Sequence, residues 1–263
     1  MIDIALNLAS SQFDSDRADV VERASQAGVT QFLLLASEVN EAEQLVPMAE
    51  SFSGAYVTAG CHPHQASTFQ TGDRQRIAQL CAHRKVVAVG ECGLDYNRNY
   101  SDPSVQRDVF AQQLDIAIEL QKPVLLHERD AEDDFMDILA PRLAELPAAV
   151  LHCFTGSAGS LTRYLDAGLY IGITGWICDE RRGLGLRKLV PQIPASRLFL
   201  ETDAPYLLPR DLPQKPKNRR NEPGYLPHIY QTVATLRGEP LEPLIAQIQT
   251  NFQQVFLNEI FSN

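Results

Sequence analysis

The sequence predicts an α/β fold, a single (β/α)8 TIM barrel with extra C-terminal helices. Eight short apolar runs alternate with helix-like segments, which is typical of a parallel α/β fold. The chain has 263 residues, close to the roughly 250 residues of such a barrel. No GxGxxG motif follows the first run, which disfavours the alternative, an open doubly wound sheet. Residues 1–263 are therefore expected to form one domain.

The eight runs are four to six residues long and rich in Val, Ile, Leu and Ala. Apolar runs without alternation are typical of strands that are buried on both faces of a parallel sheet. In chain order the predicted strands are Ile2–Leu6, Gln31–Ala36, Ala55–Ala59, Val86–Val89, Pro123–Leu126, Ala148–Leu151, Leu169–Ile173 and Arg197–Leu200.

The segments between the runs have helical patterns and helix signals. Ser104–Leu120 has apolar residues at helical spacing, and Pro103 precedes it at a position that suits a helix start. Gly28 and Gly168 follow two other helical stretches, as C-terminal stop signals do. The tail, Leu226–Asn263, is predicted to form two more helices.

Composition excludes several classes of protein. With 23 Lys and Arg against 33 Asp and Glu, the formal charge is −10, which argues against a protein that coats nucleic acid. It leaves nucleic acid open as a substrate, because a metal or a local basic patch can supply a positive field. Five cysteines without a CxxC pair indicate a reducing compartment. Met1–Ser10 lacks a basic segment of the signal-peptide kind, and no run is long enough to span a membrane. We expect a cytoplasmic protein with no membrane partner and no obligatory protein partner.

Polar residues gather where the predicted strands end, and four of the six histidines lie there. The C-terminal ends of barrel strands meet at one mouth, where active sites form. The segments at these ends are Asn7, Gly60-Cys61-His62-Pro63-His64, Gly90-Glu91-Cys92-Gly93-Leu94-Asp95, His127-Glu128-Arg129, His152-Cys153-Phe154, Thr174-Gly175-Trp176 and Glu201-Thr202-Asp203-Ala204-Pro205.

Four of these residues, Glu91, His127, His152 and Asp203, make a candidate divalent-metal site. Imidazole suits Zn, Fe, Ni and Cu, whereas carboxylate suits Mg and Mn, so the set leaves the metal open. The alternative is that the carboxylates are salt-bridged strand caps and the histidines are satisfied core donors.

Three cysteines, Cys61, Cys92 and Cys153, stand one residue away from these candidates. In a regular strand an offset of one residue points a side chain to the opposite face. We therefore predict small, buried, apolar residues and no thiolate metal ligand.

Taken in this order and at these spacings, the strand-end segments resemble the TatD family of metal-dependent deoxyribonucleases, and the namesake branch more than its shorter paralogues. The resemblance runs from Asp3 to Arg219-Arg220-Asn221-Glu222-Pro223. It implies a TIM barrel of the amidohydrolase superfamily and 3′–5′ exonuclease activity on DNA, with single strands preferred, RNA left open, and a role in DNA repair or degradation. The implied cofactor is Mg²⁺, with Mn²⁺ or Zn²⁺ as alternatives.

The resemblance also implies ligand roles. Glu91 would bind or bridge metal, His127 and His152 would bind one metal, and Asp203 would bind the other or its water. Many members of the family begin with Asp-x-His-x-His, but this chain has Asp3-Ile4-Ala5-Leu6-Asn7. We therefore expect one firm metal site and an uncertain second one, where the carbonyl oxygen of Asn7 would suit Mg²⁺.

Catalytic roles follow from the chemistry of phosphodiester hydrolysis. Asp203 is our candidate for orienting or deprotonating the attacking water, with a pure ligand or strand cap as the alternative. Glu201 lies deeper on the same strand and is expected to orient a ligand histidine, or else to form a buried ion pair. Glu91 is essential in this scheme through the metal. His62 is expected to contact the scissile phosphate or to donate a proton to the leaving oxygen.

Other residues of the mouth are candidates for binding substrate. His64 shares the role of His62, with an exposed loop histidine as the alternative. Arg129 is expected to bind a phosphate, or else to neutralise nearby carboxylates. Trp176, the only tryptophan, is expected to stack on a base, or else to pack under a helix. Arg219 belongs to the same substrate-binding set.

Charge is unevenly distributed along the acidic chain. Asp179–Lys188 has four basic and two acidic residues, and Tyr206–Glu222 has five basic and two acidic residues. These net charges of +2 and +3 leave −15 for the rest, since −10 minus 5 is −15. Both segments follow late strands, so we expect them to attract a single-stranded nucleic acid to the mouth. The alternative is a pair of solvated charged loops.

Two other functions are compatible with the sequence. A metal-activated hydroxide also attacks carbonyls, so an amide or ester hydrolase such as an aminoacyl-tRNA deacylase fits the same residues. The missing histidine pair motivates a third hypothesis, a non-catalytic binding module. It would bind nucleic acid unchanged after His127→Ala or Asp203→Ala.

Overall fold

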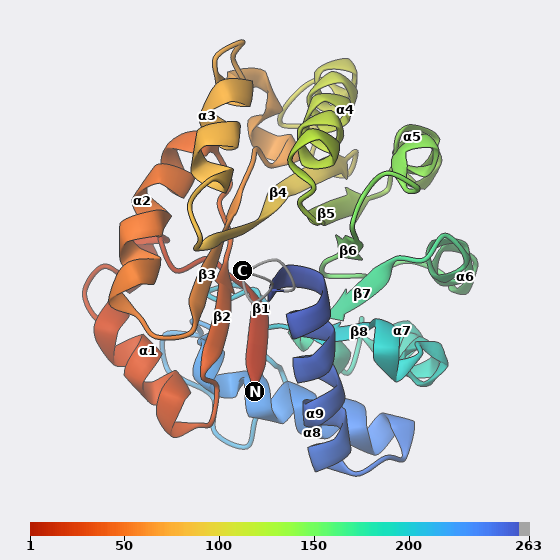
Figure 1. The fold of residues 1–263 in the computed structure, drawn as a ribbon. Helices are drawn as coiled ribbons and strands as arrows, with labels where there is room; N and C mark the ends of the chain where they lie inside the picture. The colour runs from red at the N-terminus through yellow and green to blue at the C-terminus, as the bar shows by residue number, and fades with distance from the viewer. Residues whose placement is uncertain (258–263) are drawn as a thin grey trace.

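The computed structural model describes residues 1–257 and confirms the predicted barrel (Figure 1). Eight parallel strands lie in the order of the sequence, each paired with the next. The first and last strands meet through a parallel bridge between Leu6 and Ala204. Two backbone hydrogen bonds hold this seam, from Asn7 N to Ala204 O and from Asp203 N to Ala5 O, both at 2.9 Å.

The strands lie close to the predicted runs, and differences fall at their ends. β4 continues six residues past the predicted Val89, to Asp95, and β5 continues to Arg129. Both strands extend past their apolar runs, because β4 and β5 stay paired as far as Asp95 and Arg129. The strands are β1 Ile2–Leu6, β2 Gln31–Leu34, β3 Ala55–Ala59, β4 Val86–Asp95, β5 Val124–Arg129, β6 Ala149–Leu151, β7 Tyr170–Ile173 and β8 Leu198–Leu200.

The helices surround the strands on the outside of the barrel (Figure 1). The predicted helix at Ser104–Leu120 begins one residue earlier, at Pro103, and Asp102 caps it by accepting a hydrogen bond from Ser104 N. Gly28 and Gly168 have φ of +85° and +86°, which suits glycine at a helix end. The α-helices are α1 Arg17–Gln26, α2 Val39–Ser51, α3 Asp73–Cys81, α4 Pro103–Leu120, α5 Glu132–Leu139, α6 Ala158–Asp166, α7 Leu184–Leu189, α8 Leu226–Arg237 and α9 Leu241–Phe252.

The predicted C-terminal helices are α8 and α9, followed by a π-helical turn at Gln253–Leu257. The end of the predicted segment, residues 258–263, lies outside the described residues. Both helices pack against the last strand. Tyr230 of α8 donates to Ile2 O at 3.1 Å, and Asn251 of α9 donates to Leu198 O at 2.9 Å. The two helices thus fasten the closing seam, which keeps the strand ends in register.

Within residues 1–257, no helix combines the length and the apolar character that a membrane crossing requires.

Candidate functional site

The predicted site residues come from six strands and lie at one end of the barrel. Glu91 and His127 lie within β4 and β5. The others follow the last residue of their strands by one to three residues, and they are Asn7 after β1, His62 after β3, His152 after β6 and Asp203 after β8. Because all strands are parallel, their C-terminal ends meet at the same mouth.

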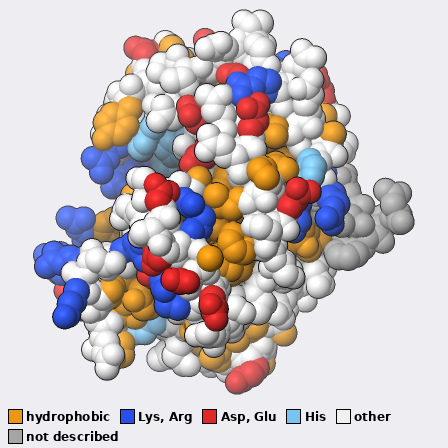
Figure 2. Space-filling view, turned by 90° about the vertical axis from the view of Figure 1, so that its left-hand side faces the viewer, with side chains coloured by type: hydrophobic (Ala, Val, Ile, Leu, Met, Phe, Trp, Pro, Cys, Tyr) orange, Lys and Arg blue, Asp and Glu red, His pale blue; other side chains and the backbone are white. Residues whose placement is uncertain are grey.

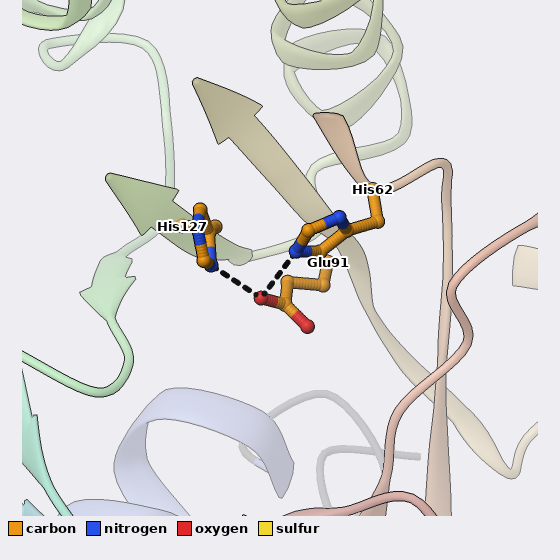
Figure 3. A group of neighbouring side chains, drawn as sticks. All are labelled: His62, Glu91 and His127. Carbon is orange, nitrogen blue, oxygen red and sulfur yellow. Dashed lines mark hydrogen bonds and ion pairs between the residues drawn. The ribbon is translucent and has the colours of Figure 1, made fainter. Parts of the chain in front are cut away.

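A buried carboxylate, Glu91, is the centre of the site. Its Oε1 lies 2.8 Å from His152 Nε2, 2.9 Å from His127 Nδ1 and 3.4 Å from His62 Nε2. Figure 3 shows His62 and His127 directed at the same carboxylate oxygen, while the other oxygen points away from both rings. Three imidazoles therefore converge on one oxygen atom.

Two glycines beside Glu91 allow β4 to approach β5 closely. Gly90 and Gly93 have φ of +139° and +146°, which side chains rarely adopt. A Cβ at Gly93 would lie 1.8 Å from His127 O, and one at Gly90 would lie 2.4 Å from Leu125 O. Glycine at both positions lets the strands bring Glu91 and His127 together.

Two buried glutamines of α4 fix the backbone at the ends of β3 and β4. Gln113 accepts from Cys61 N at 2.7 Å and donates to Cys61 O at 2.9 Å. Gln106, seven residues earlier on the helix, accepts from Asp95 N at 2.8 Å and donates to Asp95 O at 3.2 Å. Neither residue was predicted from the sequence, although polar residues seven positions apart on a buried helix face are a usable signal. They position the residue before His62 and the carboxylate of Asp95.

Asp95 is a third residue of the site that was not predicted from the sequence. Its Oδ2 lies 2.7 Å from His64 Nε2 and 3.3 Å from His127 Nε2, and its side chain is 2% exposed. Its place four residues after Glu91, at the mouth end of the same strand, was the available signal. His127 therefore lies between two carboxylates, Glu91 at Nδ1 and Asp95 at Nε2.

His152 has a similar arrangement. Nε2 faces Glu91, and Nδ1 lies 3.4 Å from Oε1 of the fully buried Glu201. The same Glu201 oxygen accepts a hydrogen bond from Cys153 N at 2.5 Å. Within residues 1–257, His152 Nδ1 and Glu201 Oε2 are buried and have no hydrogen-bond partner. Buried polar atoms without partners are uncommon, and at functional sites they often indicate a missing water or ion.

His62 differs from the other two histidines in its hydrogen bonding. The backbone N–H of His64 donates to Nδ1 of His62 at 3.0 Å, so Nδ1 is an acceptor. In a neutral imidazole the proton is then on the other nitrogen, Nε2. Burial lowers the pKa of His62 to about 4, which keeps the ring neutral at pH 7. His62 therefore directs an N–H, not a lone pair, at the centre of the site.

The carboxylates and the histidines of the site stabilise each other's charged forms. Burial alone would raise the pKa of Glu91, but His152, His62 and His127 lower it well below its ordinary value. Burial alone would lower the pKa of His152, but Glu91 and Glu201 raise it well above its ordinary value. Asp95 and Glu91 likewise overcome burial and raise the pKa of His127. Glu91 is therefore ionised at neutral pH.

Asp203 and Asn7 lie at the closing seam of the barrel. Asn7 Nδ2 donates to Asp203 Oδ1 at 2.9 Å, which leaves the amide oxygen of Asn7 as its remaining polar atom. Burial raises the pKa of Asp203 to about 7, against the lowering effect of nearby His152. Asp203 has φ of +56°, so it has left the strand geometry that ends at Leu200.

One group of potential metal ligands in residues 1–257 lies at this mouth. The donor atoms of His62, Glu91 and His127 all lie within 4.8 Å of one another. The group predicted from the sequence was Glu91 with His127, His152 and Asp203. In the structure His152 Nε2 also contacts Glu91. His62 differs from a metal ligand, because it directs its Nε2–H at the same carboxylate.

The predicted cysteines differ from one another. Cys61 and Cys92 are buried, as expected. The prediction of a buried residue was wrong for Cys153, which is only partly buried. Strand alternation does not apply to it, because β6 ends at Leu151 and Cys153 has φ of +50°. Burial raises the pKa of its thiol to about 12, so the thiol is neutral at pH 7.

The predicted substrate residues Arg129 and Trp176 line one groove of about 840 Å³ beside the mouth. Arg182 also lines this groove, and its guanidinium lies 5.5 Å from the centre of the indole ring. Trp176 is partly buried and packs against the core. Part of the indole ring therefore has the packing role that was the alternative to base stacking. Arg129 forms no ion pair with any described residue. His64 lies at the mouth, hydrogen-bonded to Asp95 and 4.8 Å from the Tyr100 ring.

Arg219 lies in the basic segment after β8, where it lines a second pocket of about 430 Å³. Three further cations line this pocket, namely Arg210, Lys215 and Lys217. The fifth cation of the segment, Arg220, is paired and contacts Asp16 and Glu222 at 2.7 Å each. Arg210 is also paired, at 3.4 Å from Glu180. Figure 2 shows Lys and Arg side chains gathered at the left of the face, close to a histidine patch. The basic segments are thus partly neutralised and partly open.

The fold and the site define a class of protein, the (β/α)8 barrels with a His and carboxylate centre at the mouth. The chain belongs to the family of TatD related DNases, whose profile matches residues 2–257. It is 54% identical to a 3′-5′ ssDNA/RNA exonuclease TatD of Klebsiella pneumoniae, over 97% of both chains. It is 51% identical to the protein of the same name in Escherichia coli K12, over 97% of this chain and 98% of that one. A crystal structure of a TatD homologue from Escherichia coli K12 superposes with a TM-score of 0.89, at 28% identity and 97% coverage of both chains.

Proposed function

We propose that this protein is a divalent-metal-dependent 3′–5′ exonuclease of single-stranded DNA and RNA. The observation that carries the proposal is the convergence of His127 and His152 on Glu91, each with a second carboxylate behind it. Metal-binding histidines commonly donate their other ring N–H to a carboxylate, which fixes the tautomer. The names of the relatives supply the substrate and the polarity of degradation.

The residues at the mouth fit a metal ion. Glu91 is ionised, and His127 Nδ1 and His152 Nε2 face it, so these three groups would hold the ion. Asp95 and Glu201 would orient the two rings from behind. We propose Mg²⁺ as the ion, with Mn²⁺ and Zn²⁺ as the alternatives that imidazole ligands also suit.

Four residues would act on the substrate. A bound divalent ion polarises the phosphoryl group and lowers the pKa of water. Asp203, held by Asn7, would accept the proton of the water whose oxygen bonds to phosphorus. His62 would donate its Nε2–H to the phosphate or to the leaving oxygen as the P–O bond breaks. Arg129, with no ionic partner among the described residues, and His64 would contact the neighbouring phosphate.

Substitution of His62 separates its role from that of a ligand. His62→Gln is expected to lower kcat by about ten- to a hundredfold, because a hydrogen-bond donor to the reacting phosphate is lost or displaced. Since His62 presents a protonated nitrogen, the bound metal is expected to stay at the wild-type level. Metal content after dialysis, measured with kcat on the same preparation, tests both expectations. Loss of the metal would make His62 a ligand and overturn the assignment.

Substitution of Trp176 tests the groove. Stacking of a base on an aromatic ring contributes about 1–3 kcal/mol, so Trp176→Ala is expected to raise KM for single-stranded DNA by about five- to a hundredfold with kcat nearly unchanged. Trp176→Phe keeps a stacking surface and should recover most of the loss. An unchanged KM in the alanine variant would assign the indole to core packing alone.

The polarity and the reaction class need a direct test. Single-stranded DNA with a 5′ label should be shortened stepwise to a ladder, whereas the same strand blocked at its 3′ end should stay intact. Release of an amino acid from aminoacyl-tRNA without shortening of the RNA would favour the deacylase instead. Binding without turnover would favour the non-catalytic module.

A further inference from the structure

A second group of metal-binding side chains lies away from the mouth centre. The sulfur of Cys178 and one donor atom each of Asp211 and His228 all lie within 4.8 Å of one another. Within residues 1–257 this is the one group of potential metal ligands that contains a cysteine. It is separate from Glu91 and the histidines around it, and hydrolysis makes no use of it.

The three residues come from three different segments. Cys178 ends the short helical turn at Gly175–Cys178 after β7. Asp211 lies in the segment after β8, and His228 lies in the first turn of α8. A ligand held by all three would fasten the two basic segments, Asp179–Lys188 and Tyr206–Glu222, to the body of the barrel.

We propose that Cys178, Asp211 and His228 form a second metal site, which takes a thiophilic divalent ion of the Zn²⁺ type. One sulfur, one nitrogen and one oxygen donor suit Zn²⁺, which binds Cys, His and Asp with tetrahedral geometry. Mg²⁺ and Ca²⁺ prefer oxygen ligands, so the cysteine separates this site from theirs. The role is structural, since the three ligands join segments that flank the site.

The geometry needs little adjustment. In a tetrahedral zinc site the bond lengths place neighbouring donor atoms about 3.3–3.8 Å apart. His228 Nε2 now lies 2.7 Å from Asp211 Oδ1, in a hydrogen bond that the ion would replace. The Asp211 and His228 side chains are 40% and 26% exposed, so water can reach the fourth position. Cys178 is fully buried and forms the floor of the site.

Neighbouring groups support the three ligands from behind. Arg187 lies 3.5 Å from the second oxygen of Asp211, Oδ2, which leaves Oδ1 for the ion. Arg187 is itself held by a hydrogen bond of 2.8 Å to Ile177 O. The Cys178 thiol donates to the hydroxyl of Thr232, one turn after His228 on α8, at 3.7 Å, and the same hydroxyl would donate to the thiolate once the ion is bound. Such outer contacts orient metal ligands and tune their affinity.

Cobalt provides a probe for this site, because thiolate-bound Co²⁺ has a near-ultraviolet charge-transfer band. We would titrate Co²⁺ into the wild type and into Glu91→Gln, in which the mouth centre is impaired. Both should show the band, and Zn²⁺ should abolish it by displacement. Absence of the band in both would overturn the proposal, whatever the nuclease assays give.

Four variants test which residues bind the ion. Cys178→Ser should lose the band, and His228→Ala, at a partly exposed position, should bind Co²⁺ at least about tenfold more weakly. Cys81→Ser, on α3, is the matched control and should keep the band. Cys153→Ser tests the thiol beside His152, and loss of the band in this variant alone would move the site to the mouth and overturn the proposal. With the mouth centre impaired by Glu91→Gln, Zn²⁺ should still raise the Tm, and adding His228→Ala to that variant should abolish the rise.

Discussion

Glu91→Gln is expected to lower the rate of strand shortening by about a hundredfold or more. The substitution keeps the size of the side chain but removes the negative charge on which His127 and His152 converge. A neutral amide is a weak ligand for a divalent ion, and the two histidines lose the partner that raises their pKa. Bound metal at the mouth should therefore fall together with the rate.

The control is Glu119→Gln on the exposed side of α4. Glu119 pairs with Arg74 and its side chain is 62% exposed, so rate and metal content should match the wild type. A Glu91→Gln enzyme that keeps its full rate would show that the carboxylate at the centre of the site is not needed. The ligand assignment would then be wrong.

Asp203→Asn is expected to lower kcat by about a hundred- to ten-thousandfold, the range for removal of a general base. The amide keeps the size of the side chain and a polar contact with Asn7, but it cannot accept a proton. The ion held by Glu91, His127 and His152 should remain. Metal content and single-turnover rates on the same sample therefore distinguish the two substitutions.

Asp115→Asn is the matched control for this substitution, because Asp115 is a half-exposed carboxylate paired with Arg142. It should keep the wild-type kcat. If Asp203→Asn loses the metal along with the rate, Asp203 is a ligand, as the family resemblance implied. If it keeps the rate, Asp203 is a cap of the closing seam.

The strand order and the position of the mouth could be predicted from the sequence. Buried parallel strands are apolar along their whole length, so the run Val124–Leu126 of β5 stands out, and the polar His127 that follows marks its mouth end. The far end of β4 could not be predicted in this way. Its last residues, Glu91 to Asp95, are held by pairing with β5 and by two glycines rather than by their own apolarity.

The partners of the site residues could not be predicted, because they are far apart in the sequence. Asn7 and Asp203 are 196 residues apart, and Gln113 and Cys61 are 52 apart. The proton on His62 Nε2 depends on one backbone N–H, which no residue pattern encodes. Residue types and spacing therefore suggested Glu91, His127, His152 and Asp203, whereas the structure adds Asp95 and shows which atom of each residue faces which partner.

The central claim, a metal-dependent exonuclease centre at the mouth, is tested most directly by metal content measured together with nuclease activity. The purified protein should hold a divalent ion, and a chelator should remove the ion and the shortening of single-stranded DNA together. Added Mg²⁺, Mn²⁺ or Zn²⁺ should restore the activity in the wild type but not in Glu91→Gln. Shortening that survives complete removal of the metal, or no shortening with any metal, would contradict the claim.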